Sequence, residues 1–541
     1  MRNPLKHLMV GSLLLGQAAC VDLDIQNPNH PDAARSLSTP EDVLSLIGSS
    51  FNSWFYGSYS FFGAGLALSN AAFQHNAPWA NAGMEKYGRI PRISFVNRIS
   101  DTDYNYLTRP WYYSYRALAA VADGLRALED PEIASALSEE ELTSARAFGR
   151  FVQGMAHATI AVLFSEGFVV DEFTELVERG GRVVPHPGNP VPYQQVMEAA
   201  KGYFEDCIVL SRGAGWVLPE GWMTAELTGS ELARTAHSMR ARYAAAVART
   251  PAERGALDWQ AILADVDSGI THDLILHMDD DDGWANGVLG HGTFSGWSQM
   301  AYFIYGMADQ SGNFQAWNAL SLRDKNHTLD GNPVLIVTPD LRFPRGSTLE
   351  EQRADPGLYF RVNRVAETGN TWARPDRGSW RWSWYKHTRG SEYWTQFVRH
   401  QPEMRMEEMN LLKAEALYRR NDREGAATII NQTRVEAGLE PTDADGTNTS
   451  CVPKLPDGTC GGLFEMMKWE KRMENTFKGP LGNLWYFDGR GWGDLWRGTF
   501  LHLPIPCGEA QVLGLLPCRT FGGVDGPMGA PLSVYRWNGE E

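Results

Sequence analysis

The chain has 541 residues, of which 43% are hydrophobic and 21% are charged. This balance supplies enough apolar side chain for a sizeable core and argues against wholesale disorder. The formal net charge is −16, from 49 Lys and Arg against 65 Asp and Glu, so a nucleic acid or another polyanion would be repelled. Neutral ligands such as sugars or peptides remain compatible with this charge.

The N-terminus has the order of an export signal. Arg2 and Lys6 give a basic start, an apolar run follows over residues 8–16, and small residues lead to Cys20. This order is typical of a secretory signal peptide, and the run is far shorter than the ~20 residues of a transmembrane helix. A cysteine at the cleavage junction predicts a lipoprotein that is cut at Cys20 and held at a membrane by lipid on that cysteine. The alternative is an ordinary signal peptide, since Gln17 stands where lipoprotein signals usually carry leucine.

Helical signals dominate the first half of the mature chain. A polar stretch rich in Pro and Asn follows the cleavage site and predicts an extended tether. Thr39, Pro40 and Asp42 then form a helix start, with Thr39 as the cap and Pro40 at the first helical position. Apolar residues at helical spacing predict further helices at residues 110–128, 138–160, 193–210, 232–247 and 259–270.

The most regular pair of predicted helices covers residues 404–418 and 424–437. Gly438 follows the second helix and predicts a left-handed cap. Small residues such as Ala414 and Ala426 lie on the facing sides, which lets the two helices approach closely. This pattern is typical of tetratricopeptide-like repeats, although long insertions separate the pairs.

Between residues 277 and 400 the helical periodicity fades, and this segment holds eight of the 19 Trp residues. We expect an irregular lobe there, carried by the helical scaffold, because loops on a rigid scaffold commonly hold binding residues. The predicted fold is mainly α, with tetratricopeptide-like helix pairs and a loop-rich lobe containing little β structure. The expected divisions are a signal peptide (1–19), a lipidated tether (20–38), an N-terminal helical scaffold (39–276), a ligand lobe (277–400) and a C-terminal region with the final helix pair (401–541).

Two loops set a tryptophan beside an amide, Trp79 with Asn81 and Trp284 with Asn286. An aromatic face next to an amide donor and acceptor suits a polyhydroxylated or peptide ligand. Trp372 in the lobe is a further candidate for ligand contact. The alternative for each residue is an ordinary packing role in the fold.

Five cysteines follow the N-terminal one. Cys451 and Cys460 bracket one short loop, Cys507 and Cys518 bracket another, and both pairs suit local disulfides in an exported protein. Pairing across the two loops is the alternative. Cys207 lies within a predicted helix and is expected to be a buried thiol.

Common catalytic signatures are missing from the sequence, which contains no P-loop, no His-Glu metalloprotease helix and no nucleophile elbow. The run from Asp279 to Asp282 does not fit an EF-hand, and a solvated acidic turn is favoured over a looser calcium site. We therefore expect no catalytic residues, no metal site and no cofactor.

Three stretches carry a resemblance to a known family. The first is Cys20 followed by an Asn-Pro-Asn tether at residues 27–29. The second is the Ala-Glu-Ala core at residues 414–416, with an Asn-x-x-Arg ending at residues 431–434. The third is a basic and acidic helix at residues 470–474, followed by a Pro-Ile-Pro close. In this order they resemble the SusD/RagB family of outer-membrane nutrient-binding lipoproteins over most of the mature chain.

The resemblance implies four tetratricopeptide-like helix pairs with a loop-rich lobe. It also implies a non-catalytic protein, lipid-anchored and surface-exposed at the outer membrane, that covers a TonB-dependent transporter of the SusC type. Such a protein captures oligosaccharides, or peptides in some members, and passes them to the transporter. The family's binding aromatics lie in the regions that hold Trp79 and Trp284 here. The residue at position 17 and the extra C-terminal cysteines depart from the family. The alternative functions are a tetratricopeptide-type adaptor that binds protein partners and a glycan-active hydrolase.

Overall fold

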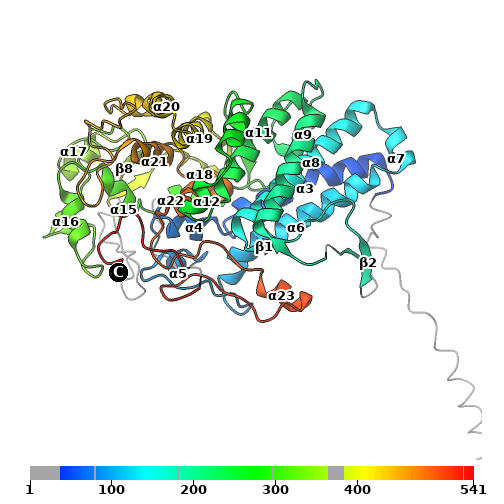
Figure 1. The fold of residues 1–541 in the computed structure, drawn as a ribbon, viewed down its shortest axis with the longest axis horizontal. Helices are drawn as coiled ribbons and strands as arrows, with labels where there is room; N and C mark the ends of the chain where they lie inside the picture. The colour runs from blue at the N-terminus through cyan, green and yellow to red at the C-terminus, as the bar shows by residue number, and fades with distance from the viewer. Residues whose placement is uncertain are drawn as a thin grey trace, which may run out of the picture.

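The computed structural model describes residues 37–77, 81–179, 182–186, 188–294, 298–363, 383–527 and 529–540. Helices dominate these residues, and the strands within them form two-stranded ribbons (Figure 1). The predicted fold class, mainly α with little β structure, is confirmed.

Long helices form a continuous stack in which each one packs on the next, from the right side of Figure 1 to its upper left. In order of packing they are α3 (Pro40–Tyr59), α6 (Tyr104–Ala127), α8 (Glu139–Leu163), α9 (Tyr193–Ser211), α11 (Gly229–Ala246), α13 (Trp259–Asp267), α19 (Met406–Arg419), α20 (Arg423–Glu436) and α21 (Leu463–Glu474). The first eight follow one another as four successive helix pairs, which is the arrangement of tetratricopeptide-like repeats.

Local capping explains where several of these helices begin. The side chain of Thr39 accepts a hydrogen bond from the backbone N–H of Asp42, and Pro40 occupies the first helical position. Ser138 and Glu141 form a complete capping box at the start of α8. At the other end of the stack, Gly438 has a φ of 73° and follows α20 in the left-handed conformation. The signals read in the sequence at these three positions are confirmed.

The predicted start of α6 at residue 110 is wrong. The helix begins at Tyr104, so Pro110 lies inside it. A proline inside a helix removes one backbone hydrogen bond, which is why the sequence favoured a start at this residue. The preceding turn nevertheless buries Tyr104 and Leu107, and we attribute the longer helix to this burial.

Gly154 of α8 allows α9 to approach closely. A Cβ atom at Gly154 would lie 2.8 Å from two ring carbons of Phe204, whereas a Cβ atom at Gly202 of α9 would meet no atom within 4 Å. We expect Gly202→Ala to stabilise the protein by about 0.5–1 kcal/mol, because alanine favours the helix. We expect Gly154→Ala to be less stable than Gly202→Ala by about 1–3 kcal/mol through overpacking. Denaturant unfolding measures both, and equal stabilities would contradict the assignment of a tight contact.

The loop-rich lobe is inserted between α13 and α19. Its short elements are β5 (Leu274–Asp279), α14 (Gly287–Thr293), α15 (Tyr302–Tyr305), η2 (Gly306–Ala308), α16 (Asn313–Ala319), β6 (Thr328–Leu329), β7 (Asn332–Pro333), α17 (Leu349–Ala354), β8 (Phe360–Val362), β9 (Tyr385–His387), α18 (Tyr393–Gln396) and β10 (Val398–Met404). Strands β5 and β10 pair antiparallel, so the first and last strands of the lobe lie side by side.

The remaining elements lie between successive scaffold helices or in the C-terminal region that follows α21. They are α4 (Gly65–Ala71), α5 (Met84–Gly88), α7 (Pro131–Ala136), β1 (Glu166–Gly167), β2 (Leu176–Arg179), β3 (Arg182–Pro185), β4 (Val191–Pro192), α10 (Glu220–Met223), α12 (Pro251–Gly255), η5 (Pro480–Gly482), α22 (Leu484–Trp492) and α23 (Cys507–Leu513).

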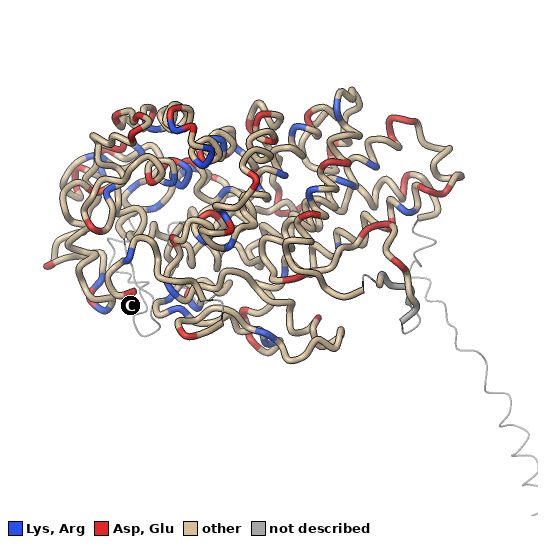
Figure 2. The backbone as a smooth tube through the Cα atoms, viewed as in Figure 1, with Lys and Arg blue, Asp and Glu red and all other residues tan. Residues whose placement is uncertain are grey.

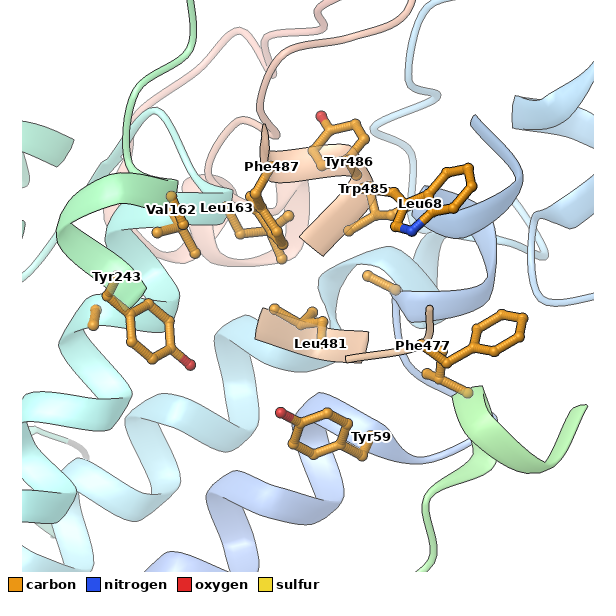
Figure 3. Close-up of a cluster of buried hydrophobic side chains, with 14 of the residues drawn as sticks. Tyr59, Leu68, Val162, Leu163, Tyr243, Phe477, Leu481, Trp485, Tyr486 and Phe487 are labelled. Carbon is orange, nitrogen blue, oxygen red and sulfur yellow. The ribbon is translucent and has the colours of Figure 1, made fainter. Parts of the chain in front are cut away.

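A shared core joins the two ends of the chain. Figure 3 shows Phe487 of α22 beside Leu163 of α8, with Tyr59 of α3 and Tyr243 of α11 in the same cluster. All four side chains are at most 1% exposed. The C-terminal segment is therefore part of the scaffold's packing rather than an appendage.

Disulfides join Cys451 to Cys460 and Cys507 to Cys518, so in this structure both pairs are local. Cys207 is a buried free thiol in α9.

Lys and Arg lie among Asp and Glu along the scaffold (Figure 2). Within the described ranges, no helix combines the length and apolar character needed to cross a membrane.

Candidate ligand-binding surface

Aromatic side chains gather where the scaffold meets the lobe. We call this set the aromatic surface, and its members are Tyr56, Phe61, Phe62, Tyr106, Arg109, Tyr113, His291, Phe294, Trp394 and Phe397. Phe62 is 46% exposed, and the other nine residues are half-buried.

Two helices of the scaffold supply one half of this surface. Tyr106, Arg109 and Tyr113 lie on one face of α6, because residues three and four positions apart are neighbours on a helix. Helix α3 ends just before Phe62 and packs on α6. The two backbones approach closely at Gly57, where a Cβ atom would lie 2.2 Å from the Cβ of Tyr113.

Arg109 holds the scaffold half together. Its guanidinium lies 5.3 Å from the ring centroids of Tyr56 and Tyr113 and 5.5 Å from that of Phe62. The Phe62 ring stacks on Tyr106 at 5.9 Å. These distances suit cation–π attraction. Among the described residues, none forms a hydrogen bond or ion pair with Arg109, and its Nη1 is buried without an acceptor.

The lobe continues the surface from α14 to α18. Phe61 lies 4.3 Å from His291 by ring centroids, and His291 lies 4.6 Å from Trp394. The Trp394 ring stacks on Phe294 at 4.2 Å and contacts Phe397 at 5.1 Å. The rings therefore form one contiguous path across the junction between the scaffold and the lobe.

His291 is uncharged at neutral pH. Burial lowers the pKa of its imidazole to about 4, although a hydrogen bond to the carbonyl of Gly287 acts in the opposite direction. Its Nδ1 lies 2.8 Å from that carbonyl oxygen, which makes Nδ1 the donor in the neutral ring. The surface thus carries one cation, Arg109, and no carboxylate among its ten members.

Two of the residues expected to contact ligand lie in the core instead. Trp284 is 5% exposed and packs against Phe51 and Phe55, with ring centroids 5.9 and 5.1 Å away. Asn286 is 2% exposed, and its side-chain oxygen caps α14 by accepting a hydrogen bond from Leu289. Their exposure does not fit ligand contact, because the indole face is covered and the amide oxygen is used by the helix.

Asn81 is half-buried, and its side-chain oxygen has no hydrogen-bond partner among the described residues. That oxygen is buried near the start of α5, where the Met84 N–H donates to the Asn81 backbone carbonyl. Trp79 and Trp372 fall outside the described residues, so their contact with ligand remains a prediction.

Sequence reasoning missed the residues of the aromatic surface. One signal was present, because residues 104–115 contain six aromatic side chains, more than one helix face can bury. Nothing in the sequence placed Phe62 near Trp394, since their proximity depends on the lobe packing against α3 and α6.

No described group of three or more His, Cys, Asp or Glu side chains is arranged to hold a metal ion. In the acidic run, the Asp281 N–H donates to the side chain of Asp279, and the Trp284 N–H donates to the Asp279 carbonyl. The run forms a tight turn at the end of β5.

The fold is similar to that of several solved structures. A SusD superfamily protein from Bacteroides vulgatus matches with a TM-score of 0.50 and 14% identity, over 84% of this chain and 88% of that one. A SusD superfamily protein from Bacteroides fragilis matches with a TM-score of 0.49 and 13% identity, over 88% and 98% of the two chains. A structure described as a SusD-like carbohydrate-binding protein from Bacteroides fragilis matches with a TM-score of 0.49 and 12% identity, over 84% and 87%.

No protein-family model matches the chain, and no curated protein matches it by sequence. The structural comparison shows a helical SusD-like fold, matched over 84% of the chain by a SusD superfamily structure. The resemblance read in the sequence is confirmed at the level of the fold.

Proposed function

We propose that this protein is a non-catalytic outer-membrane lipoprotein that captures oligosaccharides, with peptides as the alternative ligand. In this proposal it delivers them to a SusC-like TonB-dependent transporter. The observation that carries the proposal is the aromatic surface on a SusD-like scaffold. Flat aromatic faces suit the apolar faces of sugar rings, and this surface offers several such rings in contact with one another.

Polar groups on the same surface support a hydroxyl-rich ligand. No protein acceptor engages the Arg109 guanidinium among the described residues, so its Nε and Nη2 are available to donate to a sugar hydroxyl. His291 adds no charge to the surface at neutral pH, because burial lowers the pKa of its imidazole.

The composition of the surface argues against hydrolysis. A glycoside hydrolase of the common type needs two carboxyl groups on either side of the scissile bond. None of the ten members of the aromatic surface is Asp or Glu. The surface therefore suits binding and release better than bond cleavage.

The anchor and the transporter are inferred from the family resemblance. Lipid on Cys20 would hold the mature chain at the outer membrane, exposed at the cell surface, and the polar tether would let the scaffold cover the transporter. The tether predicted from the sequence at residues 20–38 would leave room between the lipid and the fold.

Glycan and peptide arrays on the mature chain from residue 20, with Cys20→Ser to keep it soluble, test the proposal. We expect glycan binding, and we expect Phe62→Ala and Trp394→Ala each to weaken it by roughly three- to tenfold. That range corresponds to the about 0.5–1.5 kcal/mol of a well-placed aromatic contact. Phe173→Ala is the control, because Phe173 is 78% exposed but lies outside the aromatic surface.

If the protein bound no glycan and no peptide on the arrays, the proposal would be wrong. If the wild type and both aromatic variants bound the ligand equally well, the aromatic surface would not be the binding site. A purely protein-binding adaptor would show the first result while retaining its protein partner. Turnover of a bound sugar would favour the hydrolase instead.

A further inference from the structure

A second concave site lies between α6 and α23, away from the aromatic surface. We call it the α6–α23 pocket, with a cavity volume of about 630 Å³. The residues that define its chemistry are Trp111, Tyr112, Tyr115, Phe168 and Glu509. The pocket uses another face of α6 than the one that carries Tyr106, Arg109 and Tyr113.

Aromatic rings form one wall of this pocket. Trp111 lies 4.8 Å from Tyr115 and 6.2 Å from Phe168 by ring centroids, and both Trp111 and Phe168 are nearly fully buried. Tyr115 is held in place because its hydroxyl donates to the Phe168 carbonyl and accepts from the Phe168 N–H. Tyr112 is 40% exposed at the same site. The wall is thus preorganised, with one ring open to solvent.

The opposite wall is the loop closed by the disulfide between Cys507 and Cys518. Two hydrogen bonds fix its start, since the Cys507 N–H donates to Asn97 and the Gly508 N–H donates to the Tyr104 hydroxyl. This loop contributes Glu509 and three aliphatic side chains to the pocket. The extra C-terminal cysteines therefore build one side of a binding cavity.

Glu509 is a carboxyl group without a countercharge. It is half-buried, and no described residue forms a hydrogen bond or ion pair with it. The residues lining the pocket include no Lys or Arg, and the one nitrogen base among them is the exposed His186. Burial raises the pKa of this carboxyl, and its charge in turn contributes to the raised pKa values of Tyr112 and Tyr115. The carboxyl group lines the same cavity as the aromatic wall, and a cation between them would relieve its poor solvation.

We propose that the α6–α23 pocket binds an organic ammonium group attached to a small apolar body. The ammonium would lie against the faces of Tyr112 and Tyr115 by cation–π attraction and pair with Glu509. The apolar body would contact Val512 and Leu515, which line the cavity and are 76% and 39% exposed. A neutral sugar could donate hydrogen bonds to the carboxylate but would leave its charge uncompensated, and an anion would be repelled, so we expect this site to differ in ligand class from the aromatic surface. The proposal does not depend on the proposed function.

Calorimetric titration of three matched probes tests the proposal on the mature chain with Cys20→Ser. The probes are hexylammonium, neutral hexanol and hexanoate, which share an alkyl body and differ in charge. We expect hexylammonium to bind at least tenfold more tightly than hexanol, and hexanoate to bind more weakly than either.

Two variants locate the site. Glu509→Gln is expected to weaken hexylammonium about tenfold and leave hexanol unchanged, because it removes the charge and keeps the shape. Tyr112→Leu is expected to weaken hexylammonium about threefold or more. The matched control is Glu166→Gln, since that carboxylate is outside the pocket and already paired with Arg519 at 3.1 Å.

Equal affinities for hexylammonium and hexanol in the wild type would overturn the proposal. So would an unchanged preference for the ammonium in Glu509→Gln, or the absence of binding by all three probes. Thermal unfolding of each variant shows whether its fold is intact, and Glu509→Gln is conservative enough to serve alone if Tyr112→Leu does not fold.

Discussion

Glu415→Ala is expected to destabilise the protein by about 3–5 kcal/mol, because it removes the central anion of a buried ion cluster. Arg254 contacts both oxygens of Glu415, at 2.8 and 2.6 Å, and the indole N–H of Trp492 donates to it at 2.9 Å. Arg254 also pairs with Asp488 at 2.8 Å, and Asp488 pairs with Lys471 at 2.9 Å. The four charged side chains of this cluster are at most 3% exposed.

Charge balance is the reason for the large effect. Arg254 and Lys471 face Glu415 and Asp488, so these four buried side chains balance in charge, and the partly exposed Arg419 also pairs with Glu415 at 3.1 Å. Loss of Glu415 alone leaves a buried positive charge without a partner. Urea or guanidinium unfolding measures the change, and Glu436→Ala is the surface control. Glu436 is exposed at the end of α20, and we expect a change within about 0.5 kcal/mol there.

A double variant distinguishes charge imbalance from lost packing. Arg254→Met with Glu415→Leu removes one charge of each sign and leaves the pair of Lys471 and Asp488. We expect the double variant to be more stable than Glu415→Ala alone, since well-packed apolar residues can replace a buried ion pair. A double variant as unstable as the sum of its parts would mean that the charges are not the cause.

The same cluster predicts sensitivity to acid. Burial opposes the charge of Glu415, but attraction to Arg254, hydrogen bonding to Arg254 and attraction to Lys471 outweigh it and lower the pKa of this carboxyl well below its usual range. A carboxyl whose pKa is lower in the folded state contributes stability above the unfolded pKa of about 4.3. This contribution is lost as the pH falls from there towards the folded pKa, and Glu415→Ala should remove that part of the acid dependence.

Local signals in the sequence were enough to define most of the helical scaffold. The cap at Thr39, the capping box at Ser138 and the left-handed Gly438 each depend on neighbours within four residues, so they could be read without the fold. Pro110 led to a wrong prediction of where α6 begins. The hydrogen bond that this proline removes is outweighed by the burial of Tyr104 and Leu107 in the same helix.

The candidate site could not be predicted in the same way. Trp284 stands in a loop sequence that suits a ligand, yet it is buried by Phe51 and Phe55 of the first long helix. The aromatic surface depends on the same long-range packing, since Phe61 of the scaffold meets His291 of the lobe. The Ala-Glu-Ala motif around Glu415 was visible in the sequence, but its partner Arg254 was not, because that contact joins α12 to α19.

Among the proposed substitutions, replacement of Cys20 is expected to have the largest effect on where the protein is found in the cell. Cys20→Ser removes the thiol that would carry the lipid, and each buried CH₂ of an acyl chain contributes about 0.8 kcal/mol to membrane binding. With two or more chains lost, the mature protein should move almost completely from the detergent-rich phase to the aqueous phase in a detergent partition experiment. The wild-type N-terminal peptide should begin at Cys20 and carry the added mass of the lipid.

Cys207→Ser is the matched control for Cys20→Ser. Cys207 is the free thiol among the described residues and lies buried in α9, where its sulfur is 3.9 Å from the Ser211 hydroxyl. Its replacement should leave partitioning and the N-terminal mass unchanged. A wild-type N-terminal peptide with an unmodified Cys20, or cleavage at another residue, would contradict the lipoprotein assignment. The fold and both binding proposals would stand, because the described elements begin only at residue 37 and none of them depends on the anchor.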